Sequence, residues 1–183
     1  MKESTKKEII SWVKSLVFAI ILAFVCRQFF FSPITVFGES MSPSFQDHDK
    51  VIISKTSKIQ RFDVIVFDAP DIENEHYIKR VIGLPGDSIE MKDDVLYING
   101  EAFNEPYLSE NRKDNPFGNL TGDFSLQEKT GKTKVPENML FVMGDNRLNS
   151  KDSRTFGLIS YDAVIGEVKF RIYPFDAFGP ANS

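Results

Sequence analysis

The distribution of hydrophobic and polar residues divides the chain into two unequal parts. Residues 12–31 form a nearly continuous apolar stretch, which as a helix would span about 30 Å and match the hydrocarbon core of a bilayer. Lys14 and Arg27 interrupt this stretch near its ends, where long basic side chains can reach the lipid headgroups. Beyond it, apolar residues occur only in short runs. The pattern predicts one transmembrane helix, followed by a folded body over residues 32–183.

The short runs of the body predict a mostly β fold. They are β-branched or aromatic and end at Asp, Gly, Pro or Asn, and they cover residues 51–53, 64–67, 77–82, 95–98, 140–143 and 164–172. Residues 92–94 and Asn99-Gly100 predict hairpin turns. We therefore expect an antiparallel or mixed all-β body. Residues 104–136 are polar and rich in turn formers, which predicts a surface excursion or a small appended subdomain.

Charge is distributed unevenly between these parts. Residues 1–31 carry +3, from five basic and two acidic side chains, and since the whole chain carries −4 the remainder carries −7. Basic residues before an apolar span predict that residues 1–11 form a cytoplasmic tail, with the body on the extracytoplasmic side of the cell membrane. An acidic body lacks the basic patch that nucleic acid requires, so no nucleic-acid partner is expected.

Two alternatives to an uncleaved membrane anchor are weaker. A cleaved secretory signal peptide needs small residues after the apolar stretch, whereas residues 29–37 contain four Phe. A lipoprotein would need a small residue before Cys26, where Val25 stands. Cys26 is also the single cysteine of the chain, so no intrachain disulfide forms. With two histidines beside it, a Cys/His zinc site is not expected, although an all-carboxylate metal site is not excluded by counting.

Two polar residues could supply a nucleophile and its base. Ser40 lies in the turn-like segment 38–43, and a serine hydroxyl attacks only when a base takes its proton. Lysine can be that base if burial keeps its amine neutral. Lys79 lies in a predicted strand with Tyr77 and Val81 on the same face, which would exclude water from the amine. The alternative is an ordinary turn serine and a solvent-facing lysine.

A third polar segment, residues 144–154, follows a predicted strand. Its acidic and basic residues could pair with one another and hold the loop rigid. The candidates for such pairs are Asp145, Arg147, Asp152 and Arg154. A solvated loop with incidental ion pairs is the alternative.

Together these segments resemble the bacterial type I signal peptidases. The matching boxes follow an N-terminal anchor in the family's order and cover residues 38–43, 61–67, 79–87 and 144–154. The resemblance implies a signal-peptidase β fold and a single-pass membrane-bound serine endopeptidase without cofactor or metal. Its partners would be the lipid bilayer and secretory preproteins, from which it would remove signal peptides after small residues (Ala-x-Ala type).

The resemblance also implies roles for individual residues. Ser40 would be the nucleophile that forms an acyl-enzyme and would offer its backbone N–H to the oxyanion, Lys79 would be the general base, and Ser150 would hydrogen-bond and orient the lysine amine. Residues that stabilise the site would be Asp145, Arg147, Asp152 and Arg154. Shallow pockets for small substrate side chains would be lined by Val36, Met41, Tyr77 and Ile78.

Distance supports this interpretation. Phe31 and Ser40 are nine residues apart, which is at most about 30 Å, so the serine stays near the outer membrane face. We expect Ser40 Oγ and Lys79 Nζ to lie within hydrogen-bond reach and the amine to be largely buried. Seventeen Phe residues exceed the needs of a small core, and an apolar surface dipping into the bilayer is one interpretation of the excess.

Three other functions remain open on the sequence alone. A Ser-His hydrolase would use His76 or His48 as the base. A self-cleaving Ser-Lys repressor-type domain shares the chemistry, but it would need a soluble DNA-binding segment in place of the anchor. A membrane-tethered β scaffold or binding protein would have no chemistry and would leave Ser40, Lys79 and segment 144–154 unexplained.

Overall fold

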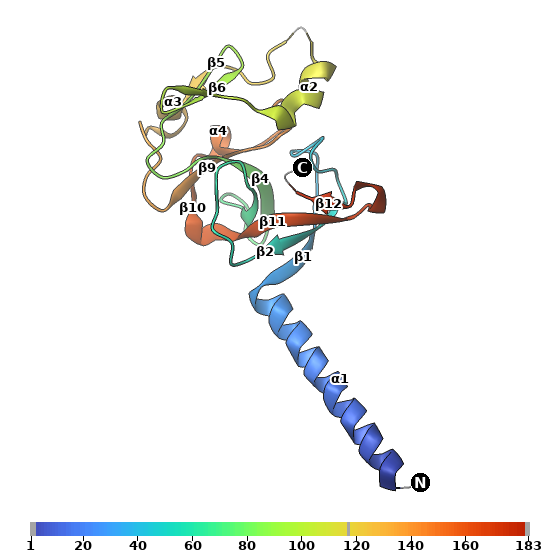
Figure 1. Ribbon diagram of the computed structural model, residues 1–183. Coiled ribbons are helices and arrows are strands. Elements are labelled where there is room, and N and C mark those ends of the chain that lie inside the picture. Colours follow the sequence, from blue (N-terminus) through green and yellow to red (C-terminus); the bar gives the residue numbers. More distant parts are fainter. Residues whose placement is uncertain (1–2, 117, 182–183) are drawn as a thin grey trace.

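The computed structural model describes residues 3–116 and 118–181, and it shows a long N-terminal helix leading into a β-rich body (Figure 1). Helix α1, Glu3–Phe29, extends away from the body. In the described part of the chain it is the one helix long and apolar enough to cross a bilayer, by length and composition. The helix ends at Phe29, two residues before the end of the anchor predicted over residues 12–31; strand β1 begins at Phe31, and the Phe30 carbonyl accepts from the Lys55 N–H at 2.9 Å.

The body contains a large antiparallel sheet in which the candidate lysine occupies a central strand. Its strand order is β1-β2-β11-β3-β4-β9-β10, and β12 pairs with β11. The bounds are β1 Phe31–Thr35, β2 Lys50–Ser54, β3 Val64–Asp68, β4 His76–Gly83, β9 Met139–Met143, β10 Ile159–Ser160, β11 Val164–Tyr173 and β12 Gly179–Pro180. Every predicted run of this sheet is a strand, and the mostly β prediction is confirmed.

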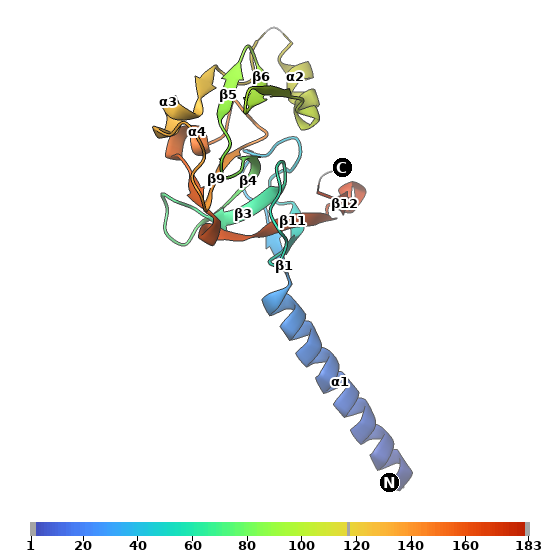
Figure 2. The same ribbon diagram turned by 60° about the vertical axis from the view of Figure 1, so that its left-hand side comes forward.

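A smaller antiparallel sheet lies at the end of the body remote from α1 (Figure 2). Its order is β7-β6-β5-β8, with bounds β5 Ile89–Lys92, β6 Val95–Ile98, β7 Glu101–Phe103 and β8 Phe124–Ser125. Both predicted hairpin turns are present. Positive φ angles at Asp93, Asp94, Asn99 and Gly100 give the two tight turns the backbone that antiparallel strands need.

Segment 104–136, predicted to be a surface excursion or a small appended subdomain, belongs to this smaller layer. It contains η1 Pro106–Leu108, α2 Ser109–Asp114, β8 and α3 Leu126–Thr130. Strand β8 pairs with β5, and α3 starts with a reciprocal cap between Ser125 and Glu128. Five of its described apolar residues are buried: Leu108, Leu120, Phe124, Leu126 and Val135. The remaining short helices are α4 Ser153–Phe156, η2 Tyr161–Ala163 and η3 Phe175–Ala177.

Strands β3 and β4 are apolar on both faces because separate core clusters cover the two sides of the large sheet. Val64, Val66 and Ile78 join one cluster, while Ile65 and Phe67 join the other, as alternation along a strand requires. A third cluster connects β4 and β9 to the smaller sheet. A lysine placed on β4 is therefore surrounded by packed side chains.

Candidate active site

Lys79 and Ser40 are in direct contact, as predicted. Lys79 lies on β4 opposite Ile65 of β3 and is only 3% exposed. Its Nζ donates to Ser40 Oγ at 2.7 Å and to the Ile78 carbonyl at 2.9 Å. Ser40 comes from the turn after β1, so the two groups meet across 39 residues of sequence.

Because Lys79 is buried, its ammonium group loses a proton more readily than that of a surface lysine. Loss of hydration lowers the pKa of Lys79 to about 8, and the charges of Asp152 and Asp145 limit the shift. The Tyr77 ring centroid lies 5.3 Å from Nζ and forms part of the apolar wall. With that pKa, about one tenth of the amine is neutral at pH 7. The pair can therefore act chemically as a nucleophile with its base.

The turn that carries Ser40 is attached to the loop after β9. The Asn146 N–H donates to the Ser40 carbonyl at 3.0 Å, and the Asn146 amide donates to the Glu39 carbonyl at 3.1 Å. Gly144 is required for this approach, since a Cβ there would collide with the Ser40 carbonyl and with Ser150 Oγ. These contacts fix the backbone on which the hydroxyl is mounted.

Helix α2 adds a second attachment. The Asn111 side-chain amide donates to the Ser42 carbonyl at 3.3 Å and to the Asp145 carbonyl at 2.8 Å, so it bridges the two loops. On the other side of the serine, Gly38 adopts φ +80° and its N–H donates to Asp47 Oδ1 at 2.8 Å. No described residue accepts a hydrogen bond from the Ser40 N–H, which leaves that donor available.

Ser150 does not make the hydrogen bond to the Lys79 amine that the family resemblance implies. Its hydroxyl is buried and has no hydrogen-bond partner among the described residues. The Lys79 amine instead donates to Ser40 and to its own strand. Ser150 Oγ lies against Gly144, close to the pair, without orienting the amine in this arrangement.

Asp145, Arg147 and Asp152 are buried and Arg154 is partly buried; all four are paired, but only one of the pairs is local. Asp152 accepts from Arg154 Nε at 2.8 Å and Nη2 at 2.7 Å, and from the Gly144 N–H at 3.0 Å. Burial opposes its charge, yet Arg154 outweighs that effect and lowers the pKa of Asp152. Asp145 pairs with Arg80, whose Nε and Nη2 donate to it at 2.9 and 2.6 Å.

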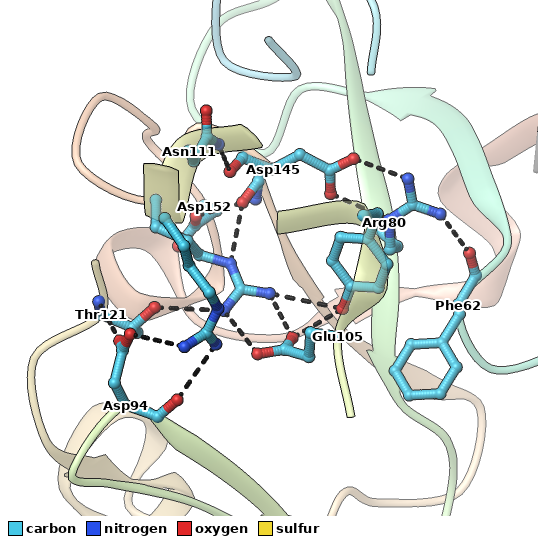
Figure 3. A network of polar contacts seen from close by, with 12 residues as sticks. Phe62, Arg80, Asp94, Glu105, Asn111, Thr121, Asp145 and Asp152 are labelled. Carbon is cyan, nitrogen blue, oxygen red and sulfur yellow. Dashed lines mark hydrogen bonds and ion pairs between the residues drawn. The ribbon is translucent and has the colours of Figure 1, made fainter. Parts of the chain in front are cut away.

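Arg147 pairs with Glu105 from segment 104–136. Figure 3 shows Glu105 and Thr121 within this polar network. Both side chains are 1% exposed. Arg147 also donates to Thr121 Oγ1 at 3.1 Å, and the Tyr107 hydroxyl donates to Glu105 at 2.6 Å. Burial opposes the charge of Arg147, but the Glu105 carboxylate outweighs it and raises the pKa of the guanidinium. The network ties the smaller sheet to the loop that holds Ser40.

A groove of about 610 Å³ lies between the end of β1 and the start of β4. Val36, Tyr77 and Ile78 line it, as the resemblance implies for substrate pockets. Met41 does not, because it is 0% exposed and packs in the core. Its side chain packs in the core instead of taking the pocket role that the resemblance implies.

The histidines point elsewhere. His48 is exposed and pairs with Asp47 at 2.7 Å, and His76 is exposed and pairs with Asp68 at 3.0 Å. Within the described residues, no group of three or more His, Cys, Asp or Glu side chains is placed to hold a metal ion. The contact made by Lys79 thus leaves neither histidine in the position of a base for Ser40.

Sequence reasoning missed several residues that build the site: Arg80, Glu105, Tyr107, Asn111, Thr121 and Asn146. Arg80 carried a usable signal, since a charge within an apolar strand implies a buried partner. Glu105 carried none, because its partner is 42 residues away and neither flanking sequence indicates the pairing.

Comparison with known proteins agrees with this architecture. A family model described as "Signal peptidase, peptidase S26" matches residues 9–173. The chain is 44% identical to Signal peptidase I S of Bacillus subtilis (strain 168), over 98% of this chain and 97% of the relative. It is 40% identical to Signal peptidase IB of Staphylococcus aureus (strain COL), over 94% of each.

A solved structure is also similar. The crystal structure of a signal peptidase I from Enterococcus faecalis V583 matches with a TM-score of 0.58 and 45% identity, covering 61% of this chain and 97% of that one. The β body with its buried polar site is thus that of a peptidase. More narrowly, the chain belongs to the signal peptidase family, peptidase S26.

Proposed function

We propose that this protein is a membrane-bound serine endopeptidase that removes N-terminal signal peptides from secretory preproteins. The observation that carries the proposal is the 2.7 Å contact between Ser40 Oγ and the buried amine of Lys79. The relatives' names, signal peptidase I, supply the substrate class.

In the proposed reaction, neutral Lys79 takes the proton of Ser40 as Oγ attacks the carbonyl carbon of the scissile peptide. The free Ser40 N–H donates to the oxyanion. The C–N bond then breaks, and Lys79 returns the proton to the departing amine of the mature protein. Water, deprotonated by Lys79, hydrolyses the acyl-enzyme and releases the signal peptide.

The groove between β1 and β4 would bind the end of the signal peptide in an extended conformation. Strand β9 pairs with β4 only from Arg80 onward, so residues 76–78 have one backbone edge unpaired by any described strand. β1 likewise pairs only with β2. Two free edges suit strand addition by the substrate. Val36, Tyr77 and Ile78 would limit side-chain size and so select Ala-x-Ala sites.

Helix α1 would cross the cell membrane with its N-terminus in the cytoplasm. Strand β1 begins one residue after the end of α1, so the sheet would begin at the membrane face. Ser40 lies in the turn that follows β1 and would therefore be near the same face. Large exposed aromatic residues would contact lipid near this face: Phe29, Phe30, Phe31, Phe37, Phe175 and Phe178.

The direct test is cleavage of a secretory preprotein by the detergent-solubilised full chain. We expect a mature protein and a short peptide, with no product from Ser40→Ala. Replacing His48 and His76 together with Ala should leave the rate within about twofold, since neither contacts the reacting pair. A tethered scaffold would yield no cleaved product, and a Ser-His enzyme would lose its activity in the histidine variant.

A further inference from the structure

One residue of the loop after β9 holds both carbonyl groups on either side of the Ser40 Cα. The Asn146 side-chain amide donates to the Glu39 carbonyl at 3.1 Å, and the Asn146 backbone N–H donates to the Ser40 carbonyl at 3.0 Å. Glu39 and Asn146 are 107 residues apart in the sequence. The two peptide groups that flank the nucleophile are therefore attached to one distant residue.

The bond to the Glu39 carbonyl matters because that carbonyl shares a peptide group with the Ser40 N–H. The peptide bond between Glu39 and Ser40 is trans, so its C=O and N–H point in opposite directions. A hydrogen bond that sets the direction of the carbonyl also sets the direction of the N–H. No described residue accepts from that N–H, so the peptide group is held at its carbonyl end.

The Glu39 carbonyl has one other donor, which lies in its own turn. The Ser42 N–H donates to it at 3.0 Å and closes a β-turn over residues 39–42. Gly38 and Glu39 are exposed, so packing does not hold this peptide group. One donor lets the peptide plane rock about a single hydrogen bond, whereas two donors define its orientation. A carbonyl that accepts two hydrogen bonds is also more strongly polarised, which makes the N–H at the other end a better donor.

We propose that Asn146 is a positioning residue for the oxyanion: through the Glu39 carbonyl it aims the Ser40 N–H at the developing negative charge. The inference rests on the proposed function. When Oγ bonds to the scissile carbonyl carbon, Lys79 takes the hydroxyl proton and the C=O electron pair moves onto the oxygen, which then accepts from the Ser40 N–H. Asn146 touches none of these atoms and acts through the peptide group between residues 39 and 40.

This role separates the transition state from substrate binding and from the base. Asn146 does not line the groove between β1 and β4, where the substrate would bind. The pKa of Lys79 is lowered by burial and is opposed by Asp152 and Asp145, without a contribution from Asn146. Loss of the Asn146 amide should therefore lower kcat, leave KM nearly unchanged and leave the rising limb of the pH profile in place.

The first test is steady-state cleavage of a preprotein by the full chain. In Asn146→Ala we expect kcat to fall on the order of tenfold, with KM within about twofold of wild type. The loss is smaller than the roughly hundredfold cost of removing an oxyanion donor, because the Ser42 N–H still holds the carbonyl. Asn146→Asp keeps the shape of the side chain but presents carboxylate oxygens to the Glu39 carbonyl, so its kcat should be lower still.

Asn119→Ala is the matched control, because it removes the same amide from an exposed position in segment 104–136. It should cleave the preprotein as wild type does. The unfolding midpoint of each variant, followed by fluorescence, shows whether folding is retained. We expect the midpoint of Asn146→Ala to stay near that of wild type, since a partly exposed hydrogen bond contributes little net stability.

A second test uses a tetrahedral adduct. With the peptide aldehyde Ala-Leu-Ala-H, Ser40 Oγ adds to the aldehyde carbon and Lys79 takes its proton, which places an oxyanion where the Ser40 N–H donates. Asn146→Ala should raise the Ki of this aldehyde by about the factor by which kcat falls. The corresponding alcohol, which forms no adduct, should bind to both proteins equally well.

Equal weakening of the aldehyde and the alcohol would overturn the inference, because it would place Asn146 in substrate binding. A raised KM with unchanged kcat, a displaced rising limb, or a fall in the unfolding midpoint that accounts for the lost rate would do the same. Failure of the wild-type chain to cleave any preprotein is a different result, which removes the proposed function itself.

Discussion

Replacing Lys79 with alanine is expected to lower kcat/KM for preprotein cleavage by about four orders of magnitude. The serine would keep its position, because its turn is held by Asn146 and Asn111 and not by the amine. It would lose the amine that contacts its hydroxyl at 2.7 Å and that would accept its proton. Initial rates over a range of preprotein concentrations, with circular dichroism to verify folding, provide the measurement.

The variant Lys79→Arg tests whether the reaction needs a base at this position or only a positive charge. Arginine retains the cation but does not deprotonate in proteins, so this variant should be as inactive as Lys79→Ala. Lys92→Ala, at an exposed position on β5, should retain wild-type rates and serves as the control. Near-normal turnover in Lys79→Ala would show that the serine–lysine pair is not the catalytic unit.

The second large effect is on stability. Glu105→Ala is expected to reduce the free energy of unfolding by about 3–5 kcal/mol, because it leaves the Arg147 guanidinium charged, buried and without its partner. Thr121 and Tyr107 offer only neutral contacts in its place. Urea unfolding of the detergent-solubilised chain, followed by fluorescence, measures the change.

Two variants sharpen the interpretation of that loss. Glu105→Gln retains an acceptor for Arg147 and should lose less than Glu105→Ala, while Glu101→Ala, exposed on β7 of the same sheet, should be close to neutral. If Glu105→Ala lowers the free energy of unfolding by less than about 1 kcal/mol, the Glu105–Arg147 pair stabilises the fold no more than a typical surface ion pair does. The network would then not be what attaches the smaller sheet to the loop of Ser40.

Local patterns predicted strands β2, β3, β4, β6, β9 and β11, because each of these apolar runs is bounded by turn-forming residues; the other six strands of the described residues were not predicted. The hairpins followed for the same reason, since Asn99-Gly100 and the Asp93-Asp94 pair adopt positive φ at low cost. For these strands and hairpins the information lies within a few residues of the feature. The Ser40–Lys79 contact was predicted through the resemblance to the signal peptidases, since the neighbours of Lys79 alone fit a solvent-facing lysine as well.

Pairings between distant segments could not be predicted in the same way. Sequence proximity suggested that the charges of 144–154 pair among themselves, yet Asp145 pairs with Arg80 and Arg147 with Glu105. Met41 illustrates the same limit, since an apolar residue beside a nucleophile fits a pocket wall or a core equally well. Which of these holds depends on the tertiary packing of β1 and β2 around it.

The account depends above all on the proton affinity of one amine. Burial lowers the pKa of Lys79 to about 8, so the fraction of neutral base, and with it kcat/KM, rises with pH and levels off above that value. The direct measurement is the titration of the Lys79 side chain by NMR of ¹³Cε-labelled lysine in the full chain, with its resonance assigned through Lys79→Arg.

That titration should give a midpoint near pH 8 that coincides with the rising limb of kcat/KM. A midpoint at about 10.4, the value of a hydrated lysine, would contradict the account, because the amine would then be protonated throughout the range in which the protein works.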